Sequence, residues 1–185
     1  MKDVIVIGGG LAGLQAAVMT AKADEETLVL DAGQSLVLNT SNIQNLIGHD
    51  SVAGNELLKS GKEKLNQFNG ELKEETVEKV ERTDSGLKVT TDEEEYEAEY
   101  VVVASAGDLS FIELDIELEE GVEGPYMMDQ HIVADDSNKA AEKLYVAGLA
   151  NTWEYQSSVA IGDGAKAAVN LLTDKYGEPY EDHDT

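Results

Sequence analysis

The chain begins with a short hydrophobic run that ends at a glycine-rich turn. Residues 3–7 include four consecutive β-branched residues, which predict a buried strand, and Gly8 follows directly. Apolar residues then recur at helical spacing from Leu11 to Ala21, and residues 27–31 form a second short apolar run. This order of strand, turn, helix and strand is typical of a βαβ unit, and therefore of a parallel sheet.

The pattern changes twice in the middle of the chain. Residues 32–53 are mostly polar and predict a long loop, of a kind that is often functional. Gly54 precedes a predicted helix that ends near Asn69 and Gly70. From residue 71 to 103 the apolar positions alternate with polar ones between turn signals, which predicts a small antiparallel meander. Val101 to Ala104 indicate a return to a central strand.

The last third of the chain holds one strand and one helix. Residues 107–128 are acidic and give no clear assignment. Residues 144–148 predict a buried strand that ends in glycine, and residues 158–176 predict a helix. The polar residues 178–185 are expected to form a frayed tail.

Together these elements predict a three-layer α/β fold. A central parallel sheet carries helices on one face and the small antiparallel β-meander on the other. A length of 185 residues suits one domain, which we place at residues 1–177.

The net charge is extreme for a folded domain. Thirteen basic residues against 38 acidic ones give −25, which argues against nucleic-acid and membrane partners. A hydrophobic fraction of 42% argues against a disordered acidic chain. A dispersed acidic coat is typical of proteins from a cytoplasm with molar salt, where repulsion is screened. The alternative is an acidic docking surface for a basic partner.

The sequence contains no cysteine, which excludes disulfides, thiolate metal sites and a dithiol redox centre. No spacing typical of a metal site is present, so no metal is expected. No apolar stretch reaches the length of a membrane span, and the N-terminus lacks the charge pattern of a signal peptide. We expect a cytoplasmic protein.

The turn after the first strand carries the motif GxGxxG, with its glycines at Gly8, Gly10 and Gly13. The first permits a tight turn, the second lets backbone approach a pyrophosphate, and the third allows close helix–strand packing. Asp31 ends the second strand and can accept hydrogen bonds from ribose hydroxyls, while its sequence neighbours offer no cation for a 2′-phosphate. The motif predicts a bound adenine dinucleotide, and the alternative is a glycine turn used only for packing.

Three blocks resemble the FAD domain of the thioredoxin reductase-like flavoproteins (pyridine nucleotide-disulfide oxidoreductases of class II), in the family's order. The first joins the glycine loop to residues 28–33. The second is residues 42–48, similar to the family's E-x-E-N-aromatic-P-G segment, followed by residues 54–58, similar to its G-x-x-L helix start. The third is residues 145–149 and 156–168, similar to the A-G-D, R-Q and A-x-G-x-G-x-x-A-A segments. The resemblance implies an FAD/NAD(P)-binding Rossmann-like fold.

The resemblance also implies FAD contacts at the adenosine end. The glycine loop would hold the pyrophosphate, and Asp31 would hold the adenosine ribose. Val77, on the meander, would offer backbone groups to the adenine.

At the flavin end, the resemblance implies contacts from four segments. Asn45 would lie near the flavin, and residues 104–106 would replace the family's A-T-G turn. Gly148 would approach the ribityl–pyrophosphate region, while Gln156 and Ser157 would present N–H groups at a helix N-terminus that can stabilise a reduced flavin. The full set of implied cofactor-binding residues is Gly8, Gly10, Leu11, Ala12, Gly13, Asp31, Ala32, Asn45, Val77, Ala104, Ser105, Ala106, Gly148, Leu149, Gln156 and Ser157.

The departures from the family are equally informative. The family's dithiol lies in a pyridine-nucleotide domain inserted between the turn at Ala104 and the A-G-D strand. Here about forty residues join those points and no second GxGxxG occurs, which is too short for such a domain. Leu149 replaces the aspartate of A-G-D and removes a hydrogen bond that the family makes to the ribityl chain or pyrophosphate.

These features predict an FAD flavoprotein of oxidoreductase type, in which the flavin is the sole redox centre and exchanges electrons with a separate donor and acceptor. The alternative is a non-catalytic module that holds FAD, NAD or ADP for sensing or assembly, and NAD is the alternative cofactor. Without a second domain the flavin ring would be exposed, so we expect a covering partner, most simply a second copy in a homodimer.

A few other residues carry weaker hypotheses. His49 is a candidate for proton transfer near the flavin, and the alternative is a histidine on the surface of the loop. Trp153 and Tyr155 are candidates for stacking on the ring or for ordinary packing. His183 belongs to the tail, and Asp163 is expected to belong to a glycine turn that starts the last helix. No catalytic acid or base is assigned.

Overall fold

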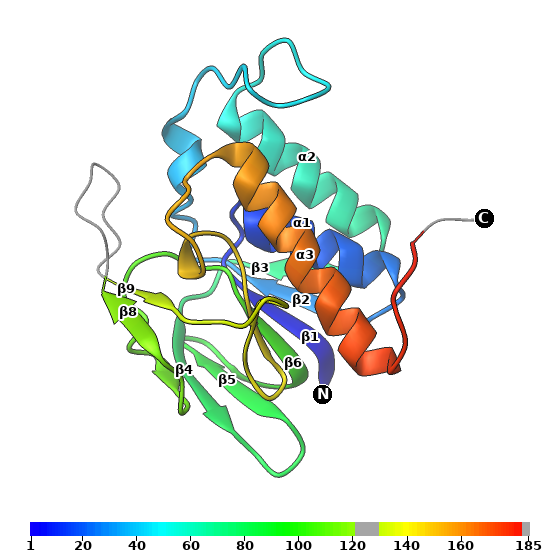
Figure 1. Cartoon of the computed structure of the whole chain (residues 1–185), viewed down its shortest axis with the longest axis vertical. Helices are drawn as coiled ribbons and strands as arrows, with labels where there is room; N and C mark the ends of the chain where they lie inside the picture. The colour runs from blue at the N-terminus through cyan, green and yellow to red at the C-terminus, as the bar shows by residue number, and fades with distance from the viewer. Residues whose placement is uncertain (121–129, 183–185) are drawn as a thin grey trace.

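The computed structural model describes residues 1–120 and 130–182 of the chain. Helices cover one face of a parallel sheet, and an antiparallel segment lies against the opposite face (Figure 1). This arrangement confirms the predicted three-layer α/β fold. His183 lies outside the described residues.

The parallel sheet is built around its first strand. β1 (Lys2–Ile7) pairs with β2 (Thr27–Leu30) on one side and with β6 (Glu95–Val103) on the other. β3 (Glu71–Lys73) extends the sheet beyond β2, and β11 (Leu144–Val146) extends it beyond β6. All these pairs are parallel, so the carboxyl ends of β1, β2, β6 and β11 meet at one edge.

Alternation along β1 divides the interior into two cores. Val4 and Val6 pack in the core beneath the helices, while Ile5 and Ile7 pack in the core shared with the meander. All four are nearly inaccessible to solvent, because each face of the sheet is covered. The run of β-branched residues therefore marks a strand buried on both sides.

Three helices form the covering layer. They are α1 (Leu11–Lys22), α2 (Gly54–Gln67) and α3 (Ser157–Tyr176), each within a few residues of the predicted range. α1 lies between the other two and contacts both.

The meander is continuous with the sheet. β4 (Val77–Arg82) pairs with β5 (Leu87–Thr91), which pairs with the first half of β6, while the second half of β6 joins the parallel sheet. The return to a central strand expected at residues 101–104 is confirmed, because Val101 to Val103 pair with β1 and β11 in the parallel sheet. One nine-residue strand serves both parts.

The remaining elements are short. The long loop is not without structure, because it contains a 3₁₀ turn and a bridge between Ile43 and Val52. The short elements of the whole described chain are η1 (Leu36–Asn39), β7 (Ile112–Glu113), β8 (Leu118–Glu120), β9 (Gln130–Ile132), β10 (Lys139–Ala141) and η2 (Gly148–Ala150).

The described part of the tail is attached to the helices rather than frayed. Asp182 Oδ1 lies 2.6 Å from Nζ of Lys22, and the backbone N–H of Tyr180 donates to Oγ1 of Thr173. Within the described residues, no helix is long and apolar enough to cross a membrane.

Candidate functional site

The site is built where β1 turns into α1. Gly8 has φ +105°, and a Cβ there would lie 2.8 Å from the carbonyl oxygen of Ala104. A side chain on Gly13 would overlap the carbonyl oxygen of Gly8. The tight turn and the close packing expected of these two glycines are therefore confirmed.

Gly10 differs from its two partners. Its φ of −74° is open to any residue, and a Cβ there would meet only Oγ of Ser35, at 3.4 Å. It is the N-cap of α1 and provides no side-chain cap, so the first N–H groups of the helix lack intrahelical or capping acceptors. Such a helix end favours an anion, and the role of Gly10 toward a pyrophosphate stays a prediction.

Asp31 is held against this loop by two backbone N–H groups. Its Oδ1 accepts hydrogen bonds from Gly9 and Gly33, each at 3.2 Å, and the residue is only 6% exposed. Its own N–H donates to the carbonyl oxygen of Lys73, which ties β2 to β3. Gly9 is not one of the motif glycines, and sequence reasoning missed its part in fixing the acid.

A pocket of about 410 Å³ opens beside Asp31. α2 brings Nζ of Lys62 to 3.8 Å from Oδ2 of Asp31, and Lys59 also lines the pocket. The absence of cations inferred from the sequence neighbours of Asp31 is therefore wrong for the folded site. These lysines come from a helix thirty residues away in sequence, and Glu63 and Glu74 offset their charge.

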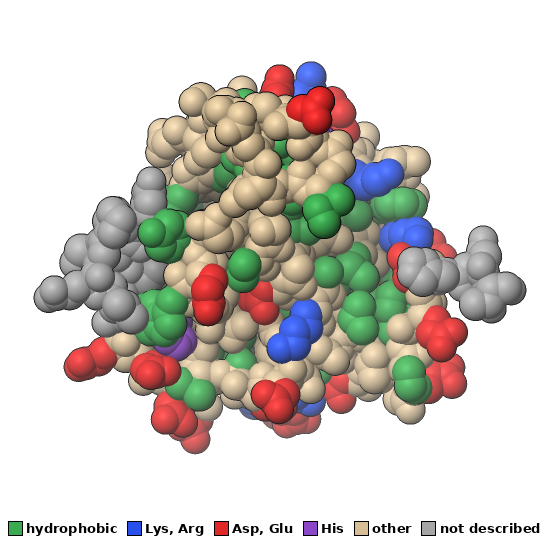
Figure 2. All heavy atoms as spheres, turned by 45° about the horizontal axis from the view of Figure 1, so that its top comes forward, with side chains coloured by type: hydrophobic (Ala, Val, Ile, Leu, Met, Phe, Trp, Pro, Cys, Tyr) green, Lys and Arg blue, Asp and Glu red, His purple; other side chains and the backbone are tan. Residues whose placement is uncertain are grey.

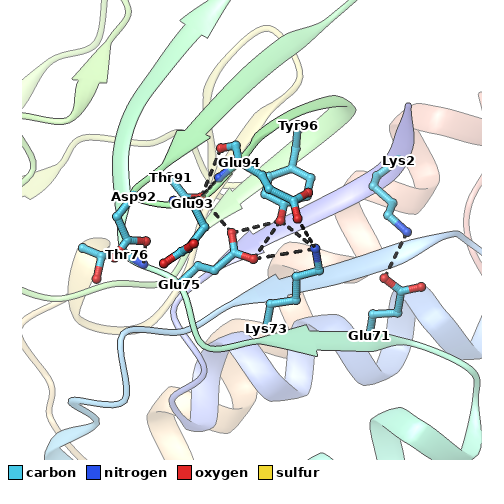
Figure 3. Close-up of polar contacts among 10 residues, drawn as sticks. All are labelled: Lys2, Glu71, Lys73, Glu75, Thr76, Thr91, Asp92, Glu93, Glu94 and Tyr96. Atoms are coloured by element: carbon cyan, nitrogen blue, oxygen red, sulfur yellow. Dashed lines mark hydrogen bonds and ion pairs between the residues drawn. The ribbon is translucent and has the colours of Figure 1, made fainter.

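The segment between β3 and β4 is braced by a buried acid. Glu75 is 9% exposed and accepts hydrogen bonds from Tyr96 OH at 2.8 Å and from Thr91 Oγ1 at 2.7 Å. Figure 3 shows Lys73 pointing at the same group, with Nζ 2.8 Å from Tyr96 OH and 3.6 Å from Oε1 of Glu75. The pocket beside Asp31 reaches this segment through Glu74, whereas Val77 is not among its lining residues.

The ends of three strands converge on the glycine turn. Ala104 donates its N–H to Ile7, and Ala147 donates to Val103. Next to this junction lies Ser105, whose Oγ is buried and has no hydrogen-bond partner in the described structure. Ala106 is exposed. A buried hydroxyl without a partner at the mouth of the glycine loop is a group that a bound molecule can satisfy.

The turn after β11 and the helix α3 pack on the first turn of α1. Gly148 has φ +65°, and a Cβ there would come within 2.7 Å of Cβ of Ala12. A Cβ on Gly164 would overlap the carbonyl oxygen of Ala12. Ala12 is thus enclosed by both, while Leu149, at the position of the family's aspartate, is only partly buried.

Asp163 lies within α3 and not in a turn before it, which corrects the expectation from the sequence. Its Oδ2 accepts the N–H of Gly148 at 2.7 Å, and its Oδ1 accepts Nδ2 of Asn138 at 2.7 Å. Nδ2 of Asn151 donates to both oxygens, at 3.2 and 3.1 Å. One helical carboxylate therefore fixes the two loops that precede β10 and follow β11.

The long loop meets the N-terminus of α3. Nδ2 of Asn45 donates to Oε1 of Gln156 at 2.8 Å, so two residues predicted near a flavin are in contact. Gln156 is the N-cap and makes no side-chain cap, which leaves the first N–H groups of α3 without capping partners. Figure 2 brings this end of the molecule forward, where backbone and uncharged side chains make up most of the upper part. Charged side chains lie at the very top, and acidic side chains lie in the middle and lower part.

Other candidate residues take ordinary positions. His49 is exposed on the loop. The ring of Trp153 packs edge-on against that of His131, with centroids 3.8 Å apart, which is ordinary packing. Tyr155 is 52% exposed. Among the described residues no group of acidic or histidine side chains has the arrangement of a metal site.

Comparison with known proteins assigns the family. Residues 2–163 match the model of a family described as pyridine nucleotide-disulphide oxidoreductase, which covers most of the chain. The chain belongs to this oxidoreductase family. The match runs from β1 through the glycine loop and into α3, so it includes all the segments that converge on the site.

The chain resembles only part of its curated relatives. The thioredoxin reductase of Bacillus subtilis is 32% identical over 148 residues, which are 79% of this chain and 46% of that protein. The chain spans about half the length, or less, of the curated relatives it matches.

Solved structures confirm the Rossmann-like fold of the chain. A thioredoxin reductase from Gloeobacter violaceus has a TM-score of 0.83 at 16% identity, covering 100% of this chain and 98% of that chain. A ferredoxin-flavin thioredoxin reductase from Clostridium acetobutylicum has a TM-score of 0.75 at 16% identity, covering 96% and 99%. At this identity the likeness concerns the fold alone.

Proposed function

We propose that the protein binds FAD and acts as an oxidoreductase in which the flavin is the only redox centre. The observation that carries this proposal is the uncapped N-terminus of α1. It opens directly from the glycine loop, with Asp31 fixed at its edge by Gly9 and Gly33. A pyrophosphate at that helix end and a ribose on the acid would satisfy both groups.

The residues along the rest of the site fit the same molecule. The pocket beside Asp31 has room for an adenosine ribose, and Ser105 offers a buried hydroxyl beside the glycine turn. Gly148 lets backbone come close to the first turn of α1. The free N–H groups of α3 lie next to Asn45, where the flavin ring would lie.

When bound, FAD supplies the electron-transfer chemistry, and the chain supplies binding, orientation and electrostatic tuning. The N–H groups at the start of α3 would favour negative charge on the ring, because they carry the positive end of the helix dipole. The backbone amides of the glycine loop would bind the pyrophosphate without a basic side chain. This matters in a chain of charge −25, which has few cations to spare.

The proposal of a flavin without dithiol or pyridine-nucleotide domain rests on the middle of the chain. β6 ends at Val103 and β11 begins at Leu144, so residues 104–143 are all that join them, and the sequence has no cysteine. We therefore propose a separate electron donor. A carrier protein is one candidate, since one structural neighbour is named a ferredoxin-flavin thioredoxin reductase.

The direct test is reconstitution of the purified chain with FAD in molar salt. We expect a yellow protein that retains FAD through gel filtration, is bleached by dithionite and recovers its colour in air. A parallel series with NADH, NADPH and a reduced ferredoxin identifies the donor class. A chain that stays colourless after incubation with FAD, while circular dichroism shows it folded, contradicts the proposal.

A second candidate function is a non-catalytic module that holds FAD, NAD or ADP. Leu149 favours it, because an apolar side chain stands where the family has a carboxylate. Binding of FAD without reduction by any physiological donor would favour this module over the oxidoreductase.

We also propose that a second copy of the chain covers the flavin end, in a cytoplasmic homodimer. Exposed apolar residues support this, because Ile47 follows Asn45 in the loop and is fully exposed, while Tyr155 precedes Gln156. Light scattering in high salt tests it, and a monomer with bound FAD contradicts it.

A further inference from the structure

The turn after β11 lacks a polar side chain at the position where its family places one. Leu149 is the second residue of η2 and is only partly buried. Asn151 closes the same turn, since its backbone N–H donates to the carbonyl oxygen of Gly148 at 2.9 Å. The side chain of Asn151 is therefore a polar group in the turn that packs, through Gly148, on Ala12 of α1.

The orientation of the Asn151 amide follows from its partner. A carboxylate only accepts hydrogen bonds, so the NH₂ end of the amide must face Asp163, and its Nδ2 does so at 3.2 and 3.1 Å from the two oxygens. The carbonyl end then points away from Asp163. No described residue donates to Oδ1 of Asn151, and the side chain is partly exposed, so this oxygen is free to accept.

Asp163 itself is fully engaged by the protein. Gly148 and Asn138 donate to it in addition to Asn151. A carboxylate with four N–H contacts has no capacity left for a ligand hydroxyl. It acts instead as the group that holds Asn151 and Gly148 in one fixed arrangement.

We propose that Oδ1 of Asn151 accepts a hydrogen bond from a ribityl hydroxyl of FAD, and that Asp163 is the positioning residue for this contact. The inference rests on the proposed function and adds a selectivity residue to it. Asn151 supplies the acceptor that Leu149 cannot, and it does so with a neutral group. In a chain of charge −25 a neutral acceptor avoids adding a carboxylate beside the pyrophosphate.

The test compares FAD with ADP, which has the adenosine and pyrophosphate but no ribityl chain. In Asn151→Ala the Kd for FAD is expected to rise roughly three- to tenfold, the usual effect of losing one neutral hydrogen bond, while the Kd for ADP stays within about twofold. Both are measured by isothermal titration calorimetry in molar salt. Asn170→Ala is the matched control and should change neither value, because the amide of Asn170 lies on α3 and donates to the carbonyl oxygen of Lys166.

Asp163→Asn tests the positioning role. Asp163 acts on the ribityl contact through Asn151. The double variant Asp163→Asn/Asn151→Ala should therefore change the ratio of FAD to ADP affinity by the same factor as Asn151→Ala alone. Compared with Asp163→Asn, Asp163→Glu should restore part of the selectivity for FAD over ADP. A merely structural role of Asp163 would weaken FAD and ADP by the same factor.

Three outcomes overturn the inference. One is an unchanged Kd for FAD in Asn151→Ala, and another is an equal loss for FAD and ADP. The third applies if Asn151→Ala does not fold and Asn151→Ser is used in its place. It is an unchanged ratio of FAD to ADP affinity in Asn151→Ser. Failure of the wild-type chain to bind FAD while it binds ADP contradicts the proposed function first, which separates the two failures.

Discussion

The backbone N–H of Gly9 donates to Oδ1 of Asp31 at 3.2 Å, and a Cβ on Gly9 would come within 2.5 Å of Oδ2 of the same carboxylate. The glycine loop therefore holds the acid as well as making room for a phosphate. Gly9 fixes the acid and Gly10 leaves the helix end open. Gly9 therefore contributes to the stability of the fold, whereas Gly10 contributes to cofactor binding.

Substitution of Gly9 should mainly lower the stability of the protein, whereas substitution of Gly10 should mainly weaken FAD binding. Gly9→Ala must displace Asp31, so we expect the cofactor-free protein to lose about 1–3 kcal/mol of its free energy of unfolding. Gly10→Ala meets only Ser35 and should change that free energy by less than about 0.5 kcal/mol, yet weaken FAD binding at least tenfold by blocking the backbone. Urea denaturation and calorimetric titration measure the two effects. Equal losses of stability in both variants would refute the division of roles.

The fold was predictable from local patterns because each βαβ signal is short. The strand, glycine turn and helix between residues 3 and 22 are specified by neighbours in sequence. The change of pattern along β6 marks the point where this strand passes from the meander into the parallel sheet. Glu95 and Glu97 alternate with less exposed residues in its first half, whereas Val101 to Val103 are buried on both faces.

Parts of the site were not predictable because their contacts join distant segments. Lys62 reaches Asp31 from α2, and Asp163 reaches Asn151 and Asn138 from α3. Neither pairing leaves a local signal. The one available hint for Asp163 was a carboxylate between two glycines near a helix start.

Two glycines in α3 provide a prediction for helix packing. Gly164 sits against the carbonyl oxygen of Ala12, so Gly164→Ala should separate α3 from α1 and destabilise the protein by more than about 2 kcal/mol. Gly162 has no atom within 4 Å of its missing Cβ. Gly162→Ala should therefore stabilise by about 0.5–1 kcal/mol, through helix propensity alone. Thermal and urea unfolding distinguish them, and a stabilising Gly164→Ala would show that the helices can shift apart freely.

The ion pair at Asp174 predicts a pH dependence. Nζ of Lys139 lies 2.7 Å from Oδ2 of Asp174, and this ammonium lowers the pKa of the carboxyl, with the OH of Tyr145 adding to the effect. Because the folded pKa lies below the unfolded one, the pair stabilises the protein fully above the usual carboxyl range, and its contribution disappears as the pH falls through the folded pKa. Lys139→Met should therefore cost about 0.2–1 kcal/mol near neutral pH, and less as the pH falls below the usual carboxyl range.

The control for that variant is Lys166→Met, because Lys166 is exposed on α3, the helix that carries Asp174, and has no ion pair in the described structure. It removes the same charge from an acidic chain without breaking a pair. A difference between the two variants that did not shrink with acidification, measured by urea denaturation over the pH series, would contradict the pKa argument.

The net charge predicts that salt stabilises both the fold and the bound cofactor. Cations are already shared among several acids, as Lys175 shows by lying 3.0 Å from Asp3, 3.1 Å from Glu25 and 2.6 Å from Glu99. Acidic side chains outnumber the lysines and arginine that could pair with them, so they repel one another. Raising the salt concentration to about 1 M shortens the screening length to about 3 Å and weakens this repulsion. We therefore expect the free energy of unfolding to rise with NaCl, and FAD to dissociate as salt is removed.

Screening is distinguished from general stabilisation by two controls. Sucrose, which is neutral, should not replace NaCl if repulsion is the cause. Asp84→Lys/Glu93→Lys, at two exposed positions, changes the net charge from −25 to −21 and should lower the salt needed to reach half-maximal stability. Flavin fluorescence after desalting reports release of the cofactor. Full stability and full occupancy in low salt would show that the acidic coat is not an adaptation to salt, and would favour the docking surface for a basic partner instead.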